Sequence, residues 1–424
     1  MKRSILLLAI IAGYYFLPSC GETTMRQTMK YMINEPVVMS KSEFRGLSIQ
    51  TKAPQEISAK GKICFYEGYL YICEPEKGIH IIDNRKPSSP VAVGFVELMG
   101  NADVAIREGK LYADAYVDLL WFDISNPAQP QLQGRIEDMF KEALPPIDNG
   151  FSYDYGLCSA EVEKGNIVVG WKLKEREGEE FYGTTNAWGL ATVEKSTAYA
   201  MSDGGMSVGA NGSMSRFGLY KDYLYTVINN TMTVIDLSGP EPVKAADEIY
   251  IGEVETIFSY KDNLFLGMPT GMSIYSVKNP LAPERMSTIW HVYGCDPVVV
   301  EDDLAYVTVH SGNACGQNNN ELLIIDVSDV ESPKLLVTYS MTKPKGLGID
   351  QGTLFLCDDG LKIYKTGDPQ QLMANRLVHF ADMEGYDVIP YDNVLMMIAD
   401  DGLYQYDYSN LEKITQLSRI AVGR

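Results

Sequence analysis

Positive charge and histidine are scarce in this sequence. The 424 residues include 36 Lys and Arg against 56 Asp and Glu, so the formal net charge is -20, and there are only 4 His residues. A surface with this excess of carboxylates repels phosphate backbones and anionic lipid headgroups. The composition therefore argues against nucleic acid as a partner and against electrostatic binding to a membrane.

Signatures of catalysis and of metal binding are also missing. The sequence contains no Walker loop, no HExxH motif and no dinucleotide fingerprint. The His residues at 80, 291, 310 and 379 stand in separate segments, and the 7 Cys residues form no CxxC pair and no zinc-type cluster with His. We therefore assign no catalytic residue and no cofactor. His80 interrupts an apolar stretch, and we interpret it as a packed histidine.

Long apolar runs are absent except at the N-terminus. Two basic residues precede an apolar stretch from Ile5 to Leu17, which is the pattern of a secretory signal. The Leu-Pro-Ser-Cys sequence that ends at Cys20 resembles a bacterial lipobox, which implies cleavage before Cys20 and lipid on its sulfur. No later stretch reaches the roughly 20 apolar residues of a spanning helix, so the lipid would be the only membrane anchor.

These features predict the first two segments of the chain and its location. We expect a lipoprotein signal peptide at 1–19, followed by a lipidated tether and N-terminal segment at 20–56. The mature protein should be an outer-membrane lipoprotein of a Gram-negative cell, facing either the periplasm or the cell surface.

A repeated segment dominates the rest of the chain. Each copy is an apolar strand that ends in Asp and runs into a Pro-containing turn. The clearest copies are GIHIIDNRKP (78–87), LLWFDISNPAQP (119–130), MTVIDLSGPEP (232–242) and LLIIDVSDVESP (322–333). Asp can accept hydrogen bonds from backbone groups just beyond it, and Pro stops a strand because it has no N–H. We therefore interpret Asp83, Asp123, Asp236 and Asp326 as residues that form turns.

The spacing of the copies predicts the architecture. A hairpin with a short acidic or glycine-bearing turn, such as FYEGYLYI or IREGKLYA, precedes each copy. Asp83 and Asp123 lie roughly 40 residues apart, and matching positions recur at similar intervals in the second half of the chain. A period of this length, filled with short strands, predicts an all-β fold: a β-propeller with four-stranded antiparallel blades.

The spacing is irregular between Asp123 and Asp236, which are too far apart for a single repeat. The segment AEVEKGNIVVGWKL (160–173) reads as another hairpin. We count it as a degraded third copy, which gives eight blades; seven remain if it only decorates its neighbours. A Gly/Ser-rich insertion at about 174–214 is expected to be flexible, and the propeller should span 57–424.

These segments resemble the LVIVD repeat family, which is named for an apolar strand that ends in Asp. The similarity covers most of residues 60–415, and Ser276, Lys365 and the third copy depart from the motif. The resemblance implies a propeller in an exported or surface protein. It carries no catalytic residues over to this chain.

Carboxylates at the start of the innermost strands are the first candidate site. They are Asp103, Glu255, Asp296 and Asp387. Loops between blades share one rim around a propeller's channel, so these side chains could converge there and hold Ca²⁺, which prefers oxygen ligands. The alternative is that they are solvated acids at strand ends.

Aromatic residues of the rim are the second candidate site. Tyr153 and Tyr155 lie before the third copy, and Trp290 and Tyr293 lie before the sixth. Flat aromatic faces with polar edges suit a glycan or a peptide. Tyr is also abundant here, with 27 residues, as expected for packing in an all-β chain.

One disulfide is geometrically plausible in an oxidising envelope. Cys295 should open the first strand of a blade, and Cys315 lies in the long polar loop after the second strand, at the same end of that hairpin. Buried free thiols are the alternative for these residues.

The sequence thus favours a non-enzymatic scaffold that binds a protein or a glycan. The alternative is a propeller enzyme, a glycosidase or lyase, that assembles carboxylates from separate blades to act on a polysaccharide. The sequence does not indicate an oligomeric state.

Overall fold

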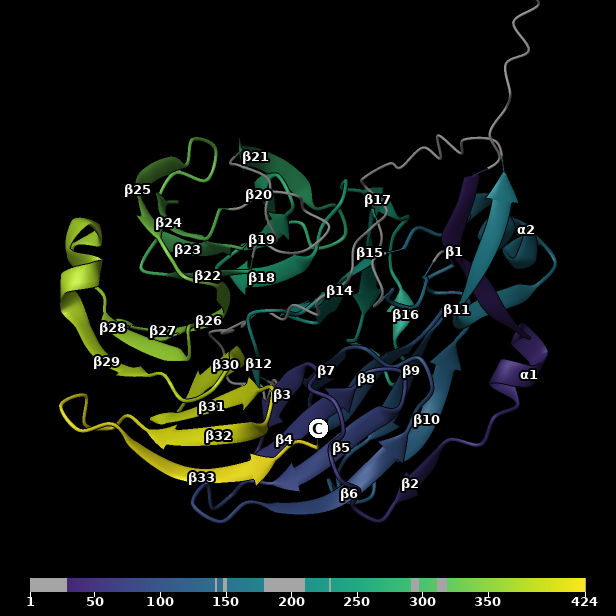
Figure 1. The fold of residues 1–424 in the computed structure, drawn as a ribbon, viewed down its shortest axis with the longest axis horizontal. Coiled ribbons are helices and arrows are strands. Elements are labelled where there is room, and N and C mark those ends of the chain that lie inside the picture. The colour runs from purple at the N-terminus through teal and green to yellow at the C-terminus, as the bar shows by residue number, and fades with distance from the viewer. Residues whose placement is uncertain are drawn as a thin grey trace, which may run out of the picture.

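Seven antiparallel sheets stand around a common centre (Figure 1). The structure is a computed structural model that describes residues 29–141, 143–147, 151–178, 210–228, 230–290, 297–310 and 319–423. The first strands of neighbouring sheets contact each other around the whole ring, from the first sheet to the seventh and back to the first. The fold is therefore a β-propeller with seven blades. The repeats predicted the propeller and its four-stranded blades correctly, but they favoured eight blades over seven.

The first three blades are formed by the following strands. Blade 1 contains β3 (Ile63–Tyr66), β4 (Tyr69–Glu74), β5 (Gly78–Asp83) and β6 (Val91–Glu97). Blade 2 contains β7 (Val104–Arg107), β8 (Lys110–Ala115), β9 (Asp118–Asp123) and β10 (Gln131–Ile136). Blade 3 contains β13 (Phe217–Tyr220), β14 (Tyr223–Ile228), β15 (Thr231–Asp236) and an outer strand split into β16 (Val243–Lys244) and β17 (Ile249–Tyr250).

The last four blades follow the same order from the centre outwards. Blade 4 contains β18 (Thr256–Tyr260), β19 (Asn263–Met268), β20 (Gly271–Ser276) and β21 (Glu284–Trp290), and blade 5 contains β22 (Val298–Glu301), β23 (Leu304–Val309), β24 (Glu321–Asp326) and β25 (Lys334–Ser340). Blade 6 contains β26 (Pro344–Asp350), β27 (Thr353–Asp358), β28 (Leu361–Lys365) and β29 (Arg376–Phe380), with the 3₁₀ helix η1 (Pro369–Asn375) before β29. Blade 7 contains β30 (Gly385–Tyr391), β31 (Val394–Ala399), β32 (Gly402–Asp407) and β33 (Thr415–Ala421).

Local turn chemistry shapes every blade in the same way. The first residue of the turn between the first two strands of each blade has a φ between 47° and 51°; these residues are Glu67, Glu108, Lys221, Lys261, Asp302, Gln351 and Asp392. A left-handed residue at this position gives the turn a twist that matches the twist of the two strands it joins. The acidic and glycine-bearing turns of the sequence therefore close the predicted hairpins.

The strand-end aspartates form turns, as predicted. Asp83 accepts a hydrogen bond from the backbone N–H of Arg85 at 3.1 Å, and Asp123 accepts one from Ser125 at 2.7 Å. The same bond, from the second residue after the Asp, recurs in blades 3, 5 and 7, at Asp236, Asp326 and Asp407. These side chains end the third strand and direct the chain towards the outer strand.

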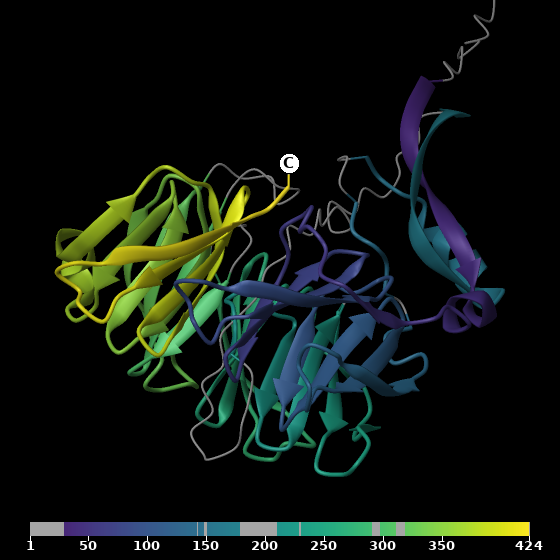
Figure 2. The ribbon, with the colours of Figure 1, turned by 90° about the horizontal axis from the view of Figure 1, so that it is seen from below.

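The segment expected to form a degraded blade has a different structure, so the count of eight blades is wrong. Residues 160–163 are the last residues of the helix α2 (Tyr155–Glu163), and a turn leads from it into β11 (Asn166–Gly178). β11 pairs antiparallel with β1 (Met29–Ser40), the first described strand of the chain. We call this two-stranded ribbon the arm; it projects past the ring on the side where the chain ends (Figure 2). The blade was mispredicted because the partner of β11 lies far from it in the sequence.

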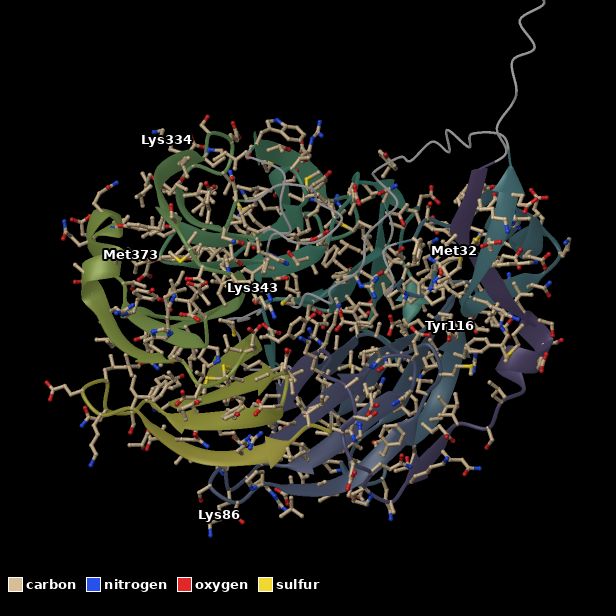
Figure 3. The ribbon with its side chains drawn as sticks, in the orientation of Figure 1. Met32, Lys86, Tyr116, Lys334, Lys343 and Met373 are labelled. Atoms are coloured by element: carbon tan, nitrogen blue, oxygen red, sulfur yellow. The ribbon has the colours of Figure 1, made fainter. Side chains whose placement is uncertain are left out.

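The arm is fixed to blade 2 at its base. The helix α1 (Lys41–Arg45) follows β1, and the Arg45 guanidinium donates to both carboxylate oxygens of the buried Asp118, at 3.0 and 2.8 Å. Tyr116, which Figure 3 labels where the arm meets the ring, donates its hydroxyl to the carbonyl of Val169 on β11 at 3.0 Å. An isolated two-stranded ribbon is marginally stable in water, so these contacts hold the arm in place.

The N-terminal segment also extends blade 1. After α1, β2 (Gln50–Lys52) pairs with β6 on the outer edge of that blade. Residues 29–56, which the sequence assigned to the tether region, thus contribute an arm strand, a helix and an extra blade strand. In the described residues, no helix is long and apolar enough to cross a membrane.

Candidate functional site

A short segment of the chain fills the centre of the propeller. Residues 210–216 leave the insertion between blades 2 and 3, and β12 (Ala210–Asn211) pairs with the inner edge of β3. We call residues 210–216 the plug. The backbone of Ser215 accepts a hydrogen bond from Ile257 of blade 4 at 2.8 Å, so the plug reaches across the ring.

Asp387 of blade 7 binds the middle of the plug. This fully buried carboxylate accepts hydrogen bonds from the N–H and the hydroxyl of Ser213, at 3.0 and 2.9 Å. The same hydroxyl accepts from the backbone N–H of Leu347 in blade 6 at 2.8 Å. A Cβ atom at Gly212 would lie 2.0 Å from Asp387 Oδ2, so only glycine fits beside this carboxylate.

Asp103 of blade 2 binds the C-terminal end of the plug. Its Oδ2 accepts from the hydroxyl of Ser215 at 2.9 Å, from the backbone N–H of Arg216 at 2.7 Å and from the ammonium of Lys62 at 2.9 Å. Lys62 is fully buried, and burial lowers its pKa although Asp103 opposes that shift. Burial also raises the pKa of the neighbouring Asp114, against the opposing charge of Arg216. Two of the predicted channel carboxylates therefore bind protein groups.

The structure describes three of the four predicted carboxylates, and they come from three different blades. Asp103 of blade 2 binds Ser215 of the plug, Asp387 of blade 7 binds Ser213, and Glu255 precedes β18 of blade 4, where its backbone N–H donates to Gly267 at 2.9 Å. Asp296 lies outside the described residues. Within the described part of the chain, no group of three or more His, Cys, Asp or Glu residues could hold a metal ion. The Ca²⁺ site stays a prediction.

The predicted aromatic residues lie on separate elements. Tyr153 stacks on Trp171 of the arm with ring centroids 5.1 Å apart, and Tyr155 is 59% exposed at the start of α2. Trp290 is 69% exposed at the end of β21 in blade 4, away from the arm in Figure 1. Tyr293 lies outside the described residues. Tyr155 and Trp290, the exposed members of the set that the structure describes, therefore lie on different elements, α2 and blade 4.

The described cysteines are buried free thiols. They are Cys64, Cys73, Cys158 and Cys357, and burial raises the pKa of each. A thiol whose pKa is raised in this way reacts poorly because little thiolate forms. The predicted bridge between Cys295 and Cys315 lies outside the described residues.

A groove beside blade 1 is a feature that the sequence did not reveal. It has a volume of about 520 Å³ and lies between the segment 44–58 and the residues around β6. Its apolar lining consists of Phe44, Leu47, Ile49, Phe95, Leu98 and Met99. We call it the blade 1 groove. A volume of this size is typical of ligand sites, which lie between about 300 and 1,000 Å³.

Polar groups around the buried Glu74 also line the blade 1 groove. Glu74 accepts hydrogen bonds from the ammonium of Lys77 at 2.5 Å and from the hydroxyl of Ser58, and His80 Nε2 lies 2.7 Å from its Oε2. Burial alone would raise the pKa of Glu74, but these hydrogen bonds lower it to about 2. Burial lowers the pKa of His80, whose ring also packs on Phe95 at 4.7 Å. His80 is therefore the packed histidine that its apolar surroundings predicted.

One sequence pattern bears on the enzyme alternative. Residues 205–209 read Gly-Met-Ser-Val-Gly, which has the GxSxG spacing of a nucleophile motif. The pattern carries meaning only where a strand precedes it and a helix follows it. It lies outside the described residues, so it assigns no nucleophile here.

Comparisons with known proteins agree with the fold. Residues 60–97, 100–138 and 296–341, which cover blades 1, 2 and 5, match the LVIVD repeat. No curated protein sequence matches the chain. Solved structures also match the chain, and three of them each share less than a tenth of its sequence.

The three structures are a designed protein and two natural ones. The computationally designed Ika8 protein is 9% identical, with a TM-score of 0.49 over 88% of this chain and 90% of that chain. Hsv2 of Kluyveromyces lactis is 8% identical, with a TM-score of 0.46 over 85% and 99% of the two chains. BamB of Moraxella catarrhalis is 9% identical, with a TM-score of 0.45 over 88% and 97%. Likenesses this distant carry no function over to this chain. Its sheets and its repeat matches identify it as a seven-bladed β-propeller that contains LVIVD repeats.

Proposed function

We propose that this protein is an exported lipoprotein whose propeller is a non-enzymatic scaffold for a protein or glycan partner. The observation that carries the proposal is the plug. Asp103 and Asp387, which the sequence offered as channel carboxylates, are buried and accept hydrogen bonds from the plug. A propeller filled in this way offers its outer surfaces for binding.

The lipid anchor and the arm together favour one orientation. Cys20 is separated from β1 by residues 21–28, and a chain of this length spans at most about 30 Å. The tip of the arm would therefore stay close to the bilayer, with the ring held beyond it. The anchor itself rests on the lipobox resemblance of the sequence.

The anchor is tested by replacing Cys20. The native protein should enter the detergent phase of a Triton X-114 extract and incorporate labelled palmitate, because lipid on Cys20 supplies its membrane affinity. The Cys20→Ser variant should do neither. A variant that partitions like the native protein would exclude the lipid anchor.

The cellular face is tested by protease shaving of intact cells. Loss of the ring from intact cells would direct the search to external proteins and glycans. Protection until the outer membrane is opened would direct it to partners in the periplasm. Turnover of a polysaccharide by the purified protein, abolished by a carboxylate substitution, would overturn the scaffold proposal in favour of an enzyme.

A further inference from the structure

The blade 1 groove combines apolar walls with a concave shape. Leu47 and Met99 contribute to its lining and remain 41% and 38% exposed. Exposed apolar surface that lies in a hollow and is surrounded by polar groups is typical of an interaction site. All of its lining residues belong to the described part of the chain.

The charge around the groove is negative. Glu56, Glu74, Glu76 and Glu97 line it, against the two cations Lys77 and Arg135. Both cations already bind carboxylates, because the Lys77 ammonium lies 2.5 Å from Glu74 and the Arg135 guanidinium lies 2.7 Å from Asp118. Two of the carboxylates are paired in the same way, Glu74 with Lys77 and Glu97 with Lys52 at 2.6 Å, so the excess of negative charge in the lining comes from Glu56 and Glu76. This excess favours a cationic ligand.

The shape of the walls favours a peptide over a sugar. Sugars stack on exposed aromatic faces, but Phe44 and Phe95, the aromatic residues of the groove, are only 3% and 4% exposed. The exposed apolar atoms belong instead to Leu47 and Met99, which suit an aliphatic side chain. A flexible Met is well adapted to such a contact.

We propose that the blade 1 groove binds a peptide segment of a partner protein in which an apolar side chain stands beside a Lys or Arg. The apolar side chain fills the space between Leu47 and Met99. The basic group lies near Glu56 and its acidic neighbours. This inference rests on the proposed scaffold function and names the partner class and the site.

Three dansylated tripeptides test the proposal with the mature protein. Leu-Lys-Leu carries both required features, Leu-Glu-Leu reverses the charge, and Ser-Lys-Ser removes the apolar side chains. Fluorescence titration should show saturable binding of Leu-Lys-Leu, with affinities for the other two weaker by about tenfold or more. Absence of saturable binding by Leu-Lys-Leu, or equal binding of all three, would overturn the proposal.

Two surface variants locate the binding. Met99→Lys and Glu56→Lys should each weaken the binding of Leu-Lys-Leu by about tenfold, since each removes one of the two matched features. Leu335→Lys is the control, because Leu335 is 52% exposed on blade 5 and lies outside the groove. The Leu335→Lys variant should bind Leu-Lys-Leu with the affinity of the native protein. Circular dichroism tests whether all three variants fold.

The outcomes separate this inference from the proposed function. Unchanged affinity in Met99→Lys and Glu56→Lys would exclude the groove. If cross-linking in cells still captured the same partner with Met99→Lys as with the native protein, the scaffold function would stand and the groove would be rejected. Loss of that cross-link in Met99→Lys alone, with Leu335→Lys unaffected, would support both.

Discussion

Glu74 shows how single buried polar residues are stabilised in this protein. Its side chain is almost inaccessible, and its carboxylate receives hydrogen bonds from Lys77 and Ser58 and lies against His80. Removing the charge of a carboxylate in such a site weakens several bonds together, because hydrogen bonds to an ionised group are stronger than neutral ones.

Glu74→Gln should therefore reduce stability in a pH-dependent way. The pKa of Glu74 is lowered from 4.5 to about 2 in the folded state, so its contribution is present above the unfolded value and is lost as the pH falls towards about 2. The stability difference between native protein and variant should be largest near neutral pH and should shrink below about pH 4.5. Urea denaturation at a series of pH values measures it.

The matched control is Glu97→Gln. Glu97 is a half-exposed carboxylate paired with Lys52 at 2.6 Å, and exposed pairs contribute little to stability. Its variant should follow the native pH curve. A deficit in Glu74→Gln that stays constant with pH would contradict the role assigned to the charge.

The plug is an element that connects several blades. Ser213 joins Asp387 of blade 7 to Leu347 of blade 6, while β12 pairs with blade 1 and Ser215 binds Asp103 of blade 2. The composition had placed Ser213 in a flexible insertion, yet Ser213 is fully buried. A Gly/Ser-rich segment is flexible when it has no tertiary contacts, but here buried carboxylates accept its hydrogen bonds and fix it.

Ser213→Ala should loosen the plug. The substitution removes the hydroxyl that donates to Asp387 and accepts from Leu347, which leaves two buried groups short of a partner and costs about 1 to 3 kcal/mol. Hydrogen exchange measured by mass spectrometry should become faster in the peptide that contains residues 210–216.

Ser328→Ala is the control for this prediction. Ser328 is exposed and its hydroxyl also donates to a carboxylate, that of Asp326, at 2.6 Å. Because that bond is exposed, its loss should change stability by less than about 0.5 kcal/mol. Unchanged exchange in the plug of Ser213→Ala would mean that the β12 pairing and the hydrogen bonds of Ser215 and Arg216 hold the plug without the Ser213 hydroxyl.

The whole ring closes where blade 7 meets blade 1. Each of these blades is built from its own end of the chain, so no shared strand joins them. The seam is held by the buried pair Asn84 and Gln405, whose amides exchange hydrogen bonds of 2.9 and 2.6 Å, and by the Gly423 N–H, which donates to Ile57 at 2.6 Å.

Asn84→Leu should therefore destabilise the entire domain. The variant leaves the fully buried amide of Gln405 without its partner, at a cost of about 1 to 3 kcal/mol. The midpoint of chemical denaturation should fall accordingly. The double variant Asn84→Leu with Gln405→Met should recover part of the loss, since replacing both partners by apolar groups leaves no amide unsatisfied. A double variant that loses the sum of both single effects would contradict this account.

The sequence by itself determined the repeating part of the protein. Turns at Glu67 and Gly68 and at the strand-end Asp83 depend on residues only a few positions apart, so the hairpins and strand ends follow from local chemistry. The same local order, repeated about every 40 residues, was sufficient to predict a propeller of four-stranded blades. The apolar surroundings of His80 also predicted its burial.

The tertiary structure alone decided the number of blades and the candidate sites. Asn34 of β1 pairs with Leu173 of β11, and Ser213 binds Asp387, and in both cases the partners come from distant parts of the sequence. The blade 1 groove likewise is lined by Leu47 and Met99, residues on segments that do not adjoin in sequence. Periodicity and turn chemistry report only on neighbours along the chain. Contacts between segments this far apart form only where the fold brings the two segments together.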